Sequence, residues 1–170
     1  MSETEQNQTF TDWLSQYKAL LFKVVRAYAV PVMDQDDLLQ EILIQVWHSI
    51  PTFRQQSSPT TWIYRIALNT AIKWSTKERK HTDAREPIDG LQPLLEQPAS
   101  QPDERIAWLY EEIHQLNEVD RSLCLLLLDG FSYKEMATIL GISESNIGVK
   151  INRIKKQLIT KSRQPDHHGI

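Results

Sequence analysis

Residues 131–158, FSYKEMATILGISESNIGVKINRIKKQL, decide the fold of the C-terminal part of the chain. Ser132 and Glu135 have the spacing of a capping box, which predicts the start of a short helix. Gly141 predicts the end of that helix at a sharp turn, and Ser143 predicts the cap of a second, longer helix. The stretch therefore predicts a helix-turn-helix.

The second of these helices has two different sides. Ile147, Ile151, Ile154 and Leu158 fall within about 60° of one another at helical spacing, which predicts a buried stripe. The opposite side is polar and basic, with short side chains near its start. A helix side of this kind can enter the major groove of DNA. It holds Ser145, Val149, Asn152, Arg153 and Lys156, flanked by Lys150 and Lys155. An ordinary helical hairpin with a solvated charged face fits this stretch equally well, so the rest of the chain must decide.

Charge is distributed unevenly along the 170 residues, although the net charge is only -3. Residues 62–80 hold five Lys or Arg against one Glu, and residues 143–163 hold six against one. Residues 81–120 hold two Arg against ten Asp or Glu. We therefore expect two basic surfaces separated by an acidic connector, in one domain or two small ones.

Several classes of function are disfavoured by what the sequence lacks. A lone cysteine, Cys124, cannot form an internal disulfide and favours a reduced, cytoplasmic compartment. No signal peptide and no run long enough to span a bilayer is apparent. The five His are scattered, and no Gly-rich phosphate loop or pairing of nucleophile and base is present. We expect no metal, no cofactor and no enzymatic activity.

The N-terminal part predicts two amphipathic helices. Residues 1–8 are polar and are expected to be disordered, and apolar residues then recur at helical spacing over residues 11–30. Asp34 is expected to cap a second helix that ends at Pro51. One side of this helix is acidic and still contains a large aliphatic residue, which favours a docking surface for a basic partner helix. Its members are Asp37, Gln40, Glu41, Ile44 and His48.

A third helix is predicted to start at Ser58 and Pro59. Its core side is formed by Ile63, Tyr64, Ala67, Leu68, Ala71 and Trp74. The other side mixes aromatic, aliphatic, amide and basic residues: Trp62, Arg65, Ile66, Asn69, Lys73, Thr76 and Lys77. Such a mixture is typical of surfaces that bind unstacked bases. The alternative is that Trp62 is simply buried in a three-helix bundle.

The region from residue 81 to residue 102 shows no periodicity and contains Pro87, Pro93, Pro98 and Pro102, which predicts a linker. Helices are expected to resume near Asp103 and again from Asp120 to Asp129, before the helix-turn-helix; the residues after 159 form a polar tail. The predicted fold is all-α, with a three-helix domain over residues 10–80 and a four-helix domain over residues 103–161.

Three sequence blocks now point to one family. DDLLQE, FRQQSSPTTWIYRIALNTAIKW and LNEVDRSLCLLLLDGFSYKEMATILGISESNIGVKINRIKKQL resemble, in this order, signature regions of the extracytoplasmic-function sigma factors. These are small two-domain sigma-70 family subunits of bacterial RNA polymerase. The resemblance covers nearly everything from residue 10 to residue 159.

The resemblance implies a role for each surface. Asp37, Leu38, Gln40 and Glu41, with Ile44 on the same face, are expected to bind the clamp helices of the polymerase largest subunit. Trp62, Tyr64, Arg65 and Asn69, with Lys73 beside them, are expected to melt and hold the promoter -10 element, and Phe53 belongs to the loop that pockets a flipped base. Gly148, Val149, Asn152 and Arg153, with Ser145, Lys150 and Lys156, are expected to read the -35 duplex.

Two positions depart from the family pattern. Most relatives have a basic residue and a serine where this chain has Gly148 and Val149, so two polar contacts are missing and the base pairs that are read are open. The resemblance further implies core polymerase, including its flap, and promoter DNA as partners. It also implies an anti-sigma factor, no small-molecule substrate, and a role in a stress or envelope response. We also hypothesise that the acidic linker folds over the basic surfaces of the free protein.

Two other classes of function remain open at the level of the residues. A stand-alone helix-turn-helix repressor or activator would bind palindromic duplexes as a dimer without polymerase. An adaptor that binds other proteins through its acidic helix would show no salt-dependent binding to nucleic acid.

Overall fold

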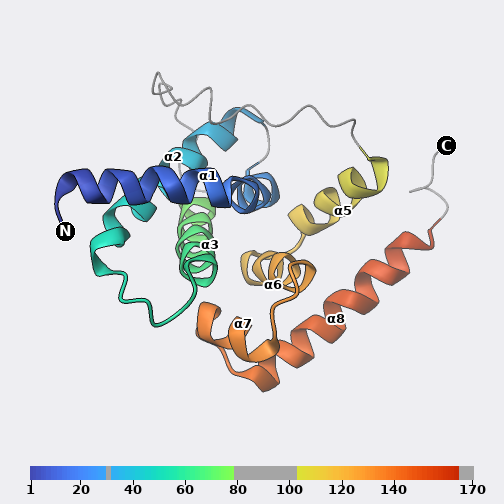
Figure 1. Cartoon of the computed structure of the whole chain (residues 1–170). Helices are drawn as coiled ribbons and strands as arrows, with labels where there is room; N and C mark the ends of the chain where they lie inside the picture. Colours follow the sequence, from blue (N-terminus) through green and yellow to red (C-terminus); the bar gives the residue numbers. More distant parts are fainter. Residues whose placement is uncertain (30–31, 79–102, 165–170) are drawn as a thin grey trace. The chain divides into compact units, whose positions relative to one another are not determined.

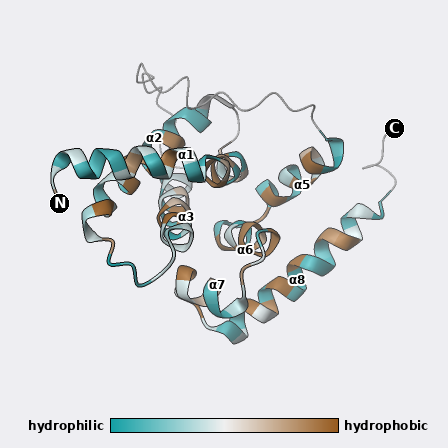
Figure 2. Cartoon of the chain, viewed as in Figure 1, coloured by the Kyte–Doolittle hydropathy of each residue, from teal (hydrophilic) through white to brown (hydrophobic). Residues whose placement is uncertain are grey.

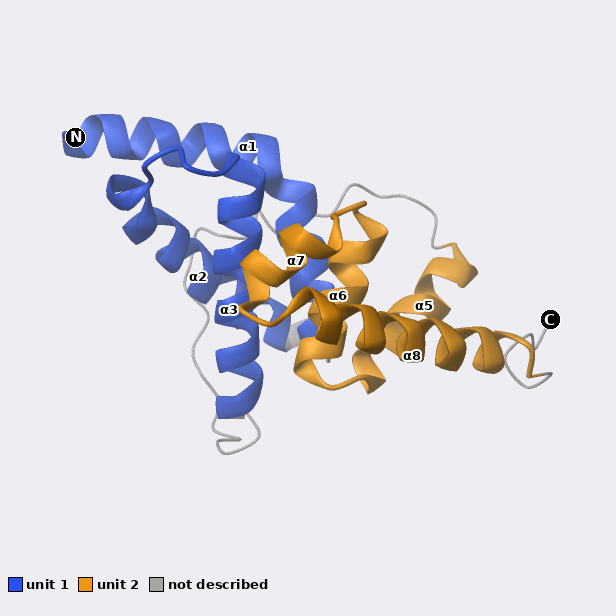
Figure 3. Cartoon of the chain, turned by 90° about the horizontal axis from the view of Figure 1, so that it is seen from below, with its two compact units in different colours: residues 1–99 blue, residues 100–170 orange. Residues whose placement is uncertain are grey.

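The computed structural model describes residues 1–29, 32–78 and 103–164 (Figure 1). In these ranges the secondary structure consists of helices without any strand, which confirms the all-α prediction. The chain divides into two compact units, residues 1–99 and residues 100–170 (Figure 3). The predicted linker, residues 81–102, and the hypothesis that it covers the basic surfaces lie outside the described residues.

The N-terminal unit is a three-helix bundle with a short 3-10 turn. Its elements are α1 (Glu3–Tyr28), α2 (Val32–Ser49), η1 (Ile50–Thr52) and α3 (Pro59–Glu78). Each of the three long helices packs against the other two. Val24, Ile42 and Leu68 are fully buried where they meet, which is the core that the helical spacing of the apolar residues predicts.

The first helix begins earlier than predicted. Residues 1–8 were expected to be disordered, but α1 starts at Glu3, where Ser2 and Glu5 form a reciprocal capping box. Gln6 donates a hydrogen bond to the Trp47 carbonyl (2.8 Å), and the indole nitrogen of Trp47 donates to the Asn7 side chain (2.9 Å). These hydrogen bonds join polar groups of two helices. The periodicity of apolar residues therefore could not predict that residues 3–8 are helical.

The start of α3 follows the prediction, whereas that of α2 does not. Helix α2 begins at Val32, so Asp34 lies in its first turn instead of capping it. At α3, the hydroxyl of Ser58 accepts a hydrogen bond from the Thr61 amide (3.2 Å), and Pro59 is the first helical residue.

The C-terminal unit contains α5 (Glu104–Gln115), α6 (Glu118–Leu128), α7 (Tyr133–Leu140) and α8 (Glu144–Ser162). The capping box of Ser132 and Glu135, the left-handed Gly141 (φ 71°) and the Ser143 cap are all present, which confirms the helix-turn-helix. Helix α8 extends to Ser162, beyond the predicted start of a tail at residue 160.

Helix α8 packs against both α6 and α7 through its apolar stripe. Ile147, Ile151 and Ile154 are buried, and the alternation of hydrophobic and hydrophilic residues along α8 is visible in Figure 2. The stripe therefore fixes which side of α8 remains accessible. Across the described helices of both units, none combines the length and the apolar character that a bilayer crossing requires.

Candidate nucleic-acid interface

The acidic side of α2 presents most of the residues that were expected to bind a partner. Gln40 and Glu41 are half-buried, and Ile44 is 46% exposed beside them on the same face. Asp37 is also half-buried, and its carboxylate accepts a hydrogen bond from the indole nitrogen of Trp74 (3.1 Å). Asp37 therefore connects α2 to α3, and its assignment to a partner remains a prediction.

Two residues of the expected sites lie in the core instead. Leu38 and Tyr64 are 0% exposed, so neither can touch polymerase or DNA across the folded surface. Leu38 is one helical turn before the buried Ile42, and Tyr64 is one turn before the buried Leu68, which places both on the inner stripe. In this structure both residues support the helices that carry the surface, and the direct-contact roles expected for Leu38 and Tyr64 remain predictions that their burial does not favour.

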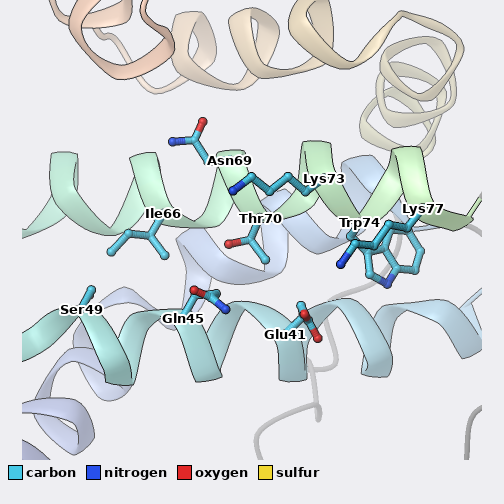
Figure 4. A pocket seen from close by; sticks show the side chains of 9 residues that line it. All are labelled: Glu41, Gln45, Ser49, Ile66, Asn69, Thr70, Lys73, Trp74 and Lys77. Atoms are coloured by element: carbon cyan, nitrogen blue, oxygen red, sulfur yellow. The ribbon is translucent and has the colours of Figure 1, made fainter.

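A groove of about 480 Å³ runs between α2 and α3 (Figure 4). Its walls are polar and charged, with one buried aromatic residue at the end. They comprise Glu41, Gln45, Ser49, Ile66, Asn69, Thr70, Lys73, Trp74 and Lys77. Asn69 and Lys73 were expected to bind the -10 element, and Glu41 to bind polymerase, so the groove brings parts of two predicted sites together. Amides and ammonium groups beside an aliphatic wall suit a nucleic-acid strand.

An aromatic cluster supports the loop between η1 and α3. Phe53 lies edge-on to Trp13 with ring centroids 5.3 Å apart, and it lies 5.4 Å from Trp62. The indole nitrogen of Trp62 donates a hydrogen bond to the Ser49 hydroxyl (3.2 Å). Both Phe53 and Trp62 are half-buried, so the alternative that Trp62 packs within the bundle is partly realised. In the loop between η1 and α3, Gln55 has a φ of 56°, a conformation that non-glycine residues adopt rarely.

The exposed face of α3 carries the remaining residues of the expected -10 site. Arg65, Asn69 and Lys73 are exposed and follow one another at intervals of four residues, so they form a single row along the helix. None of the three depends on the core for its position, in contrast to Tyr64. This row and the groove beside it form one continuous polar surface.

The outer face of α8 is divided between exposed residues and residues tied to the core. Ser145, Val149, Asn152 and Lys156 are exposed, with Val149 at 70%. Gly148 is half-buried beside Tyr133, and a Cβ atom there would stand 3.6 Å from the tyrosine ring. This face has the character that the prediction assigned to it, and its contact with DNA remains a prediction.

Asp120, a buried carboxylate of α6, holds two of the basic residues of α8. Its Oδ2 accepts a hydrogen bond from Arg153 Nη2 (2.7 Å), and its Oδ1 lies 3.9 Å from Lys150 Nζ. The side chain of Asn117 donates to the same Oδ2 (3.1 Å), while its own oxygen caps the Asp120 amide (2.9 Å). The cation pair was expected to read DNA, yet both residues also fix α8 to α6.

Cys124 lies one turn beyond Asp120 on α6 and is buried. Burial, and to a smaller extent the charge of Asp120, raises the pKa of the Cys124 thiol to about 11. The thiol therefore stays protonated near neutral pH and behaves as a small apolar core group.

Sequence reasoning missed Trp13, Ser49, Asp120 and Tyr133 as residues that position the surfaces. Trp13 and Ser49 have no motif, because their contacts with Phe53 and Trp62 cross between elements. Asp120 lies in the first turn of α6, where an aspartate is common, so nothing in the sequence indicated that its carboxylate is buried. Which partner it has could not be read from spacing along one helix.

Two family descriptions match the chain in order. Sigma-70 region 2 matches residues 13–81, and sigma-70 region 4 matches residues 106–158. Each match falls within one of the two compact units.

Curated relatives and solved structures agree with these matches. The chain is 30% identical over 148 residues to the ECF RNA polymerase sigma factor SigX of Bacillus subtilis, covering 77% of this chain and 75% of SigX. It is 27% identical to the ECF RNA polymerase sigma-E factor of Escherichia coli K12, covering 86% of this chain and 82% of that protein. The fold is similar to that of the sigma factor RpoE of Bartonella quintana, solved with the anti-sigma factor NepR (TM-score 0.66, 18% identity, 92% and 99% coverage). It is also similar to CnrH solved with the cytosolic domain of CnrY (TM-score 0.64, 18% identity, 93% and 91% coverage).

Proposed function

Since this chain is an extracytoplasmic-function sigma factor of the sigma-70 family, we propose that its two units divide promoter recognition between them. The protein directs RNA polymerase to specific promoters and initiates transcription. In our proposal, residues 10–80 bind core polymerase and open the -10 element, and residues 103–161 read the -35 duplex. The observation that carries this division is the order of regions 2 and 4 on separate compact units, each with an exposed polar helix face.

The acidic side of α2 is the proposed polymerase contact. Gln40, Glu41 and Ile44 combine an amide, a carboxylate and an exposed aliphatic group on one helical face, which suits a basic amphipathic helix. Asp37 supports this face through its bond to Trp74. The proposed partners on the polymerase are the clamp helices, with the flap as the contact of the C-terminal unit.

The groove between α2 and α3, with the row of Arg65, Asn69 and Lys73, is the proposed -10 surface. Unstacking a base costs a few kcal/mol, and stacking and hydrogen bonding on the protein must offset this cost. Phe53 and Trp62 contribute by holding the loop in which an extruded base would be bound. The proposed mechanism uses binding free energy alone, so the protein itself is not an enzyme.

The outer face of α8 is the proposed reader of the -35 duplex. Ser145, Val149 and Asn152 would face base edges, and Lys156 a phosphate. Lys150 and Arg153 would contact phosphates from their positions around Asp120, which fix their direction.

An anti-sigma factor is part of the proposal, as is action in the cytoplasm during a stress or envelope response. This part is supported by the relatives that are sigma-E factors and by the sigma factor RpoE of Bartonella quintana, which was solved with an anti-sigma factor. Release from such a partner would expose the surfaces described above.

The test of the function is run-off transcription by purified core polymerase on genomic fragments, with and without the protein. Selective start sites that appear only when the protein is added are the expected result. Recognition of an operator by the protein alone, without selective starts from polymerase, would instead support a stand-alone helix-turn-helix regulator.

Three variants separate the proposed surfaces. Glu41→Lys should abolish co-purification with core polymerase. Glu111→Lys makes the same change of charge at an exposed position of α5 and should leave co-purification unchanged. Asn69→Ala should reduce permanganate reactivity of -10 thymines while sparing affinity for a -35 duplex. Asn152→Ala should do the reverse, and a loss of both activities in either variant would contradict the division.

A further inference from the structure

Val149 is the most exposed large hydrophobic residue of the C-terminal unit's described part. It is 70% exposed, compared with 58% for Leu128 and 50% for Ile159. A single exposed apolar side chain is common on protein surfaces and by itself indicates nothing. The small and polar residues around Val149 on α8 are the reason to consider a function for it.

The neighbours of Val149 on the helix face are small and polar. Ser145 lies one turn before it and Asn152 one turn after it, and both are exposed. Gly148, directly before it, has no side chain, and the nearest atom to a Cβ built there is Cε2 of Tyr133 at 3.6 Å. Gly148 adds no side chain and those of Ser145, Val149 and Asn152 are short, so a groove of DNA could come close to this part of the backbone.

The long cations on this part of α8 are held by other contacts. Arg153 Nη2 lies 2.7 Å from the buried carboxylate of Asp120, and Lys150 Nζ lies 3.9 Å from it. A bidentate contact to guanine requires an arginine or lysine that is free to point into the groove. Around Val149, the exposed side chains that Asp120 does not hold include Ser145, Asn146 and Asn152, together with Val149 itself.

We propose that Val149 reads the 5-methyl group of a thymine in the -35 duplex. This inference rests on the proposed function of α8. Thymine is the only standard base that presents a methyl group in the major groove, and apolar side chains are its usual partners. Burying one methyl group against Val149 corresponds to about a fourfold gain in affinity. The specificity of this chain is then set at this position by an apolar contact in place of a polar one.

The test uses the full chain bound to core polymerase and a promoter selected by that holoenzyme from a randomised -35 library. Each thymine of the selected -35 element is replaced singly by deoxyuridine, which removes the methyl group and keeps every hydrogen-bonding atom. Replacement by 5-bromodeoxyuridine fills the same space and serves as the control on the DNA. Equilibrium binding is measured for the wild type, Val149→Ala and Ile159→Ala, the last being an exposed aliphatic residue on the same helix.

Removal of the methyl group at one position should weaken wild-type binding about fourfold, and bromine should restore it. The same loss should appear in Ile159→Ala and be absent from Val149→Ala. A wild type that is indifferent to every methyl group, or a methyl effect that persists in Val149→Ala, would overturn the inference while leaving the proposed function intact. A holoenzyme that selects no promoter at all would overturn the proposed function and this inference together.

Discussion

Replacing Asp120 by alanine should loosen the C-terminal unit, because this carboxylate joins α6 to α8. Its side chain is 5% exposed and accepts bonds from Arg153 (2.7 Å) and Asn117 (3.1 Å). A hydrogen bond to a charged group contributes about 1.5–3 kcal/mol when buried. The Arg153 side chain is 57% exposed, so solvent screening places its bond near the lower limit, about 1.5 kcal/mol. The bond that the uncharged and exposed Asn117 side chain donates to the same carboxylate is placed at about 0.5 kcal/mol, so the expected loss is about 2 kcal/mol.

Cys124 provides the assay for this loss. It is the single cysteine of the chain, it is 3% exposed, and it lies on the same helix as Asp120. A thiol reagent can reach Cys124 only when α6 opens locally. The labelling rate therefore follows the opening equilibrium of this unit alone. A loss of about 2 kcal/mol corresponds to labelling about 30 times faster than in the wild type.

Two comparisons make the result specific. Glu111→Ala removes an exposed carboxylate from α5 and should leave the labelling rate unchanged. In an Arg153→Ala background, the effect of Asp120→Ala should shrink, because the two residues share one interaction. Labelling of Asp120→Ala at the wild-type rate, or an undiminished effect without Arg153, would refute the reasoning.

Three further changes test other parts of the structure. Gly148→Ala should stabilise α8 by about 1 kcal/mol and slow Cys124 labelling about fivefold, because its Cβ would meet the Tyr133 ring at an ordinary 3.6 Å; faster labelling would indicate a clash. Asn7→Ala removes the acceptor of the Trp47 indole, so amide exchange should accelerate over the first turns of α1; unchanged exchange would mean that the capping box alone holds them. Raising the pH should destabilise the C-terminal unit between about 9 and 11. The folded state keeps the Cys124 proton up to a pKa of about 11, against an ordinary value of 9.0, so its stabilising effect is complete below 9 and lost above 11. Denaturation of Cys124→Ala over the same range should lack this part of the loss.

The sequence predicts those parts of the fold whose cause is local. The capping box at Ser132, the left-handed Gly141 and the caps at Ser58 and Ser143 each depend on residues within a few positions of one another. The apolar stripes of α2, α3 and α8 are equally local, because helical spacing alone defines them. The first turns of α1 were missed for the opposite reason, since Gln6 and Asn7 bond to Trp47, some forty residues away.

The expected site residues divide along the same line. Leu38 and Tyr64 were assigned to surfaces through the family motif, although the spacing of their own helices places them with Ile42 and Leu68 in the core. A motif records that a position matters without recording whether the side chain faces a partner or supports a neighbour that does. At Tyr64 helical spacing already predicted the core side of its helix, whereas the burial of Leu38 was not predicted and is seen only in the structure.

Arg153 shows why a basic residue on a recognition helix cannot be assigned a role from its helix alone. Sequence spacing puts it on the side of α8 away from the isoleucine stripe, and its partner Asp120 lies 33 residues earlier on another helix. Only the packing of α8 on α6 brings the two charges to 2.7 Å. In the proposed function, the guanidinium held by this carboxylate contacts a phosphate only in the direction that the bond allows, and Ser145, Val149 and Asn152 are left to read the bases. We therefore expect that a change at these uncharged residues would alter promoter preference even where the cations of α8 are kept.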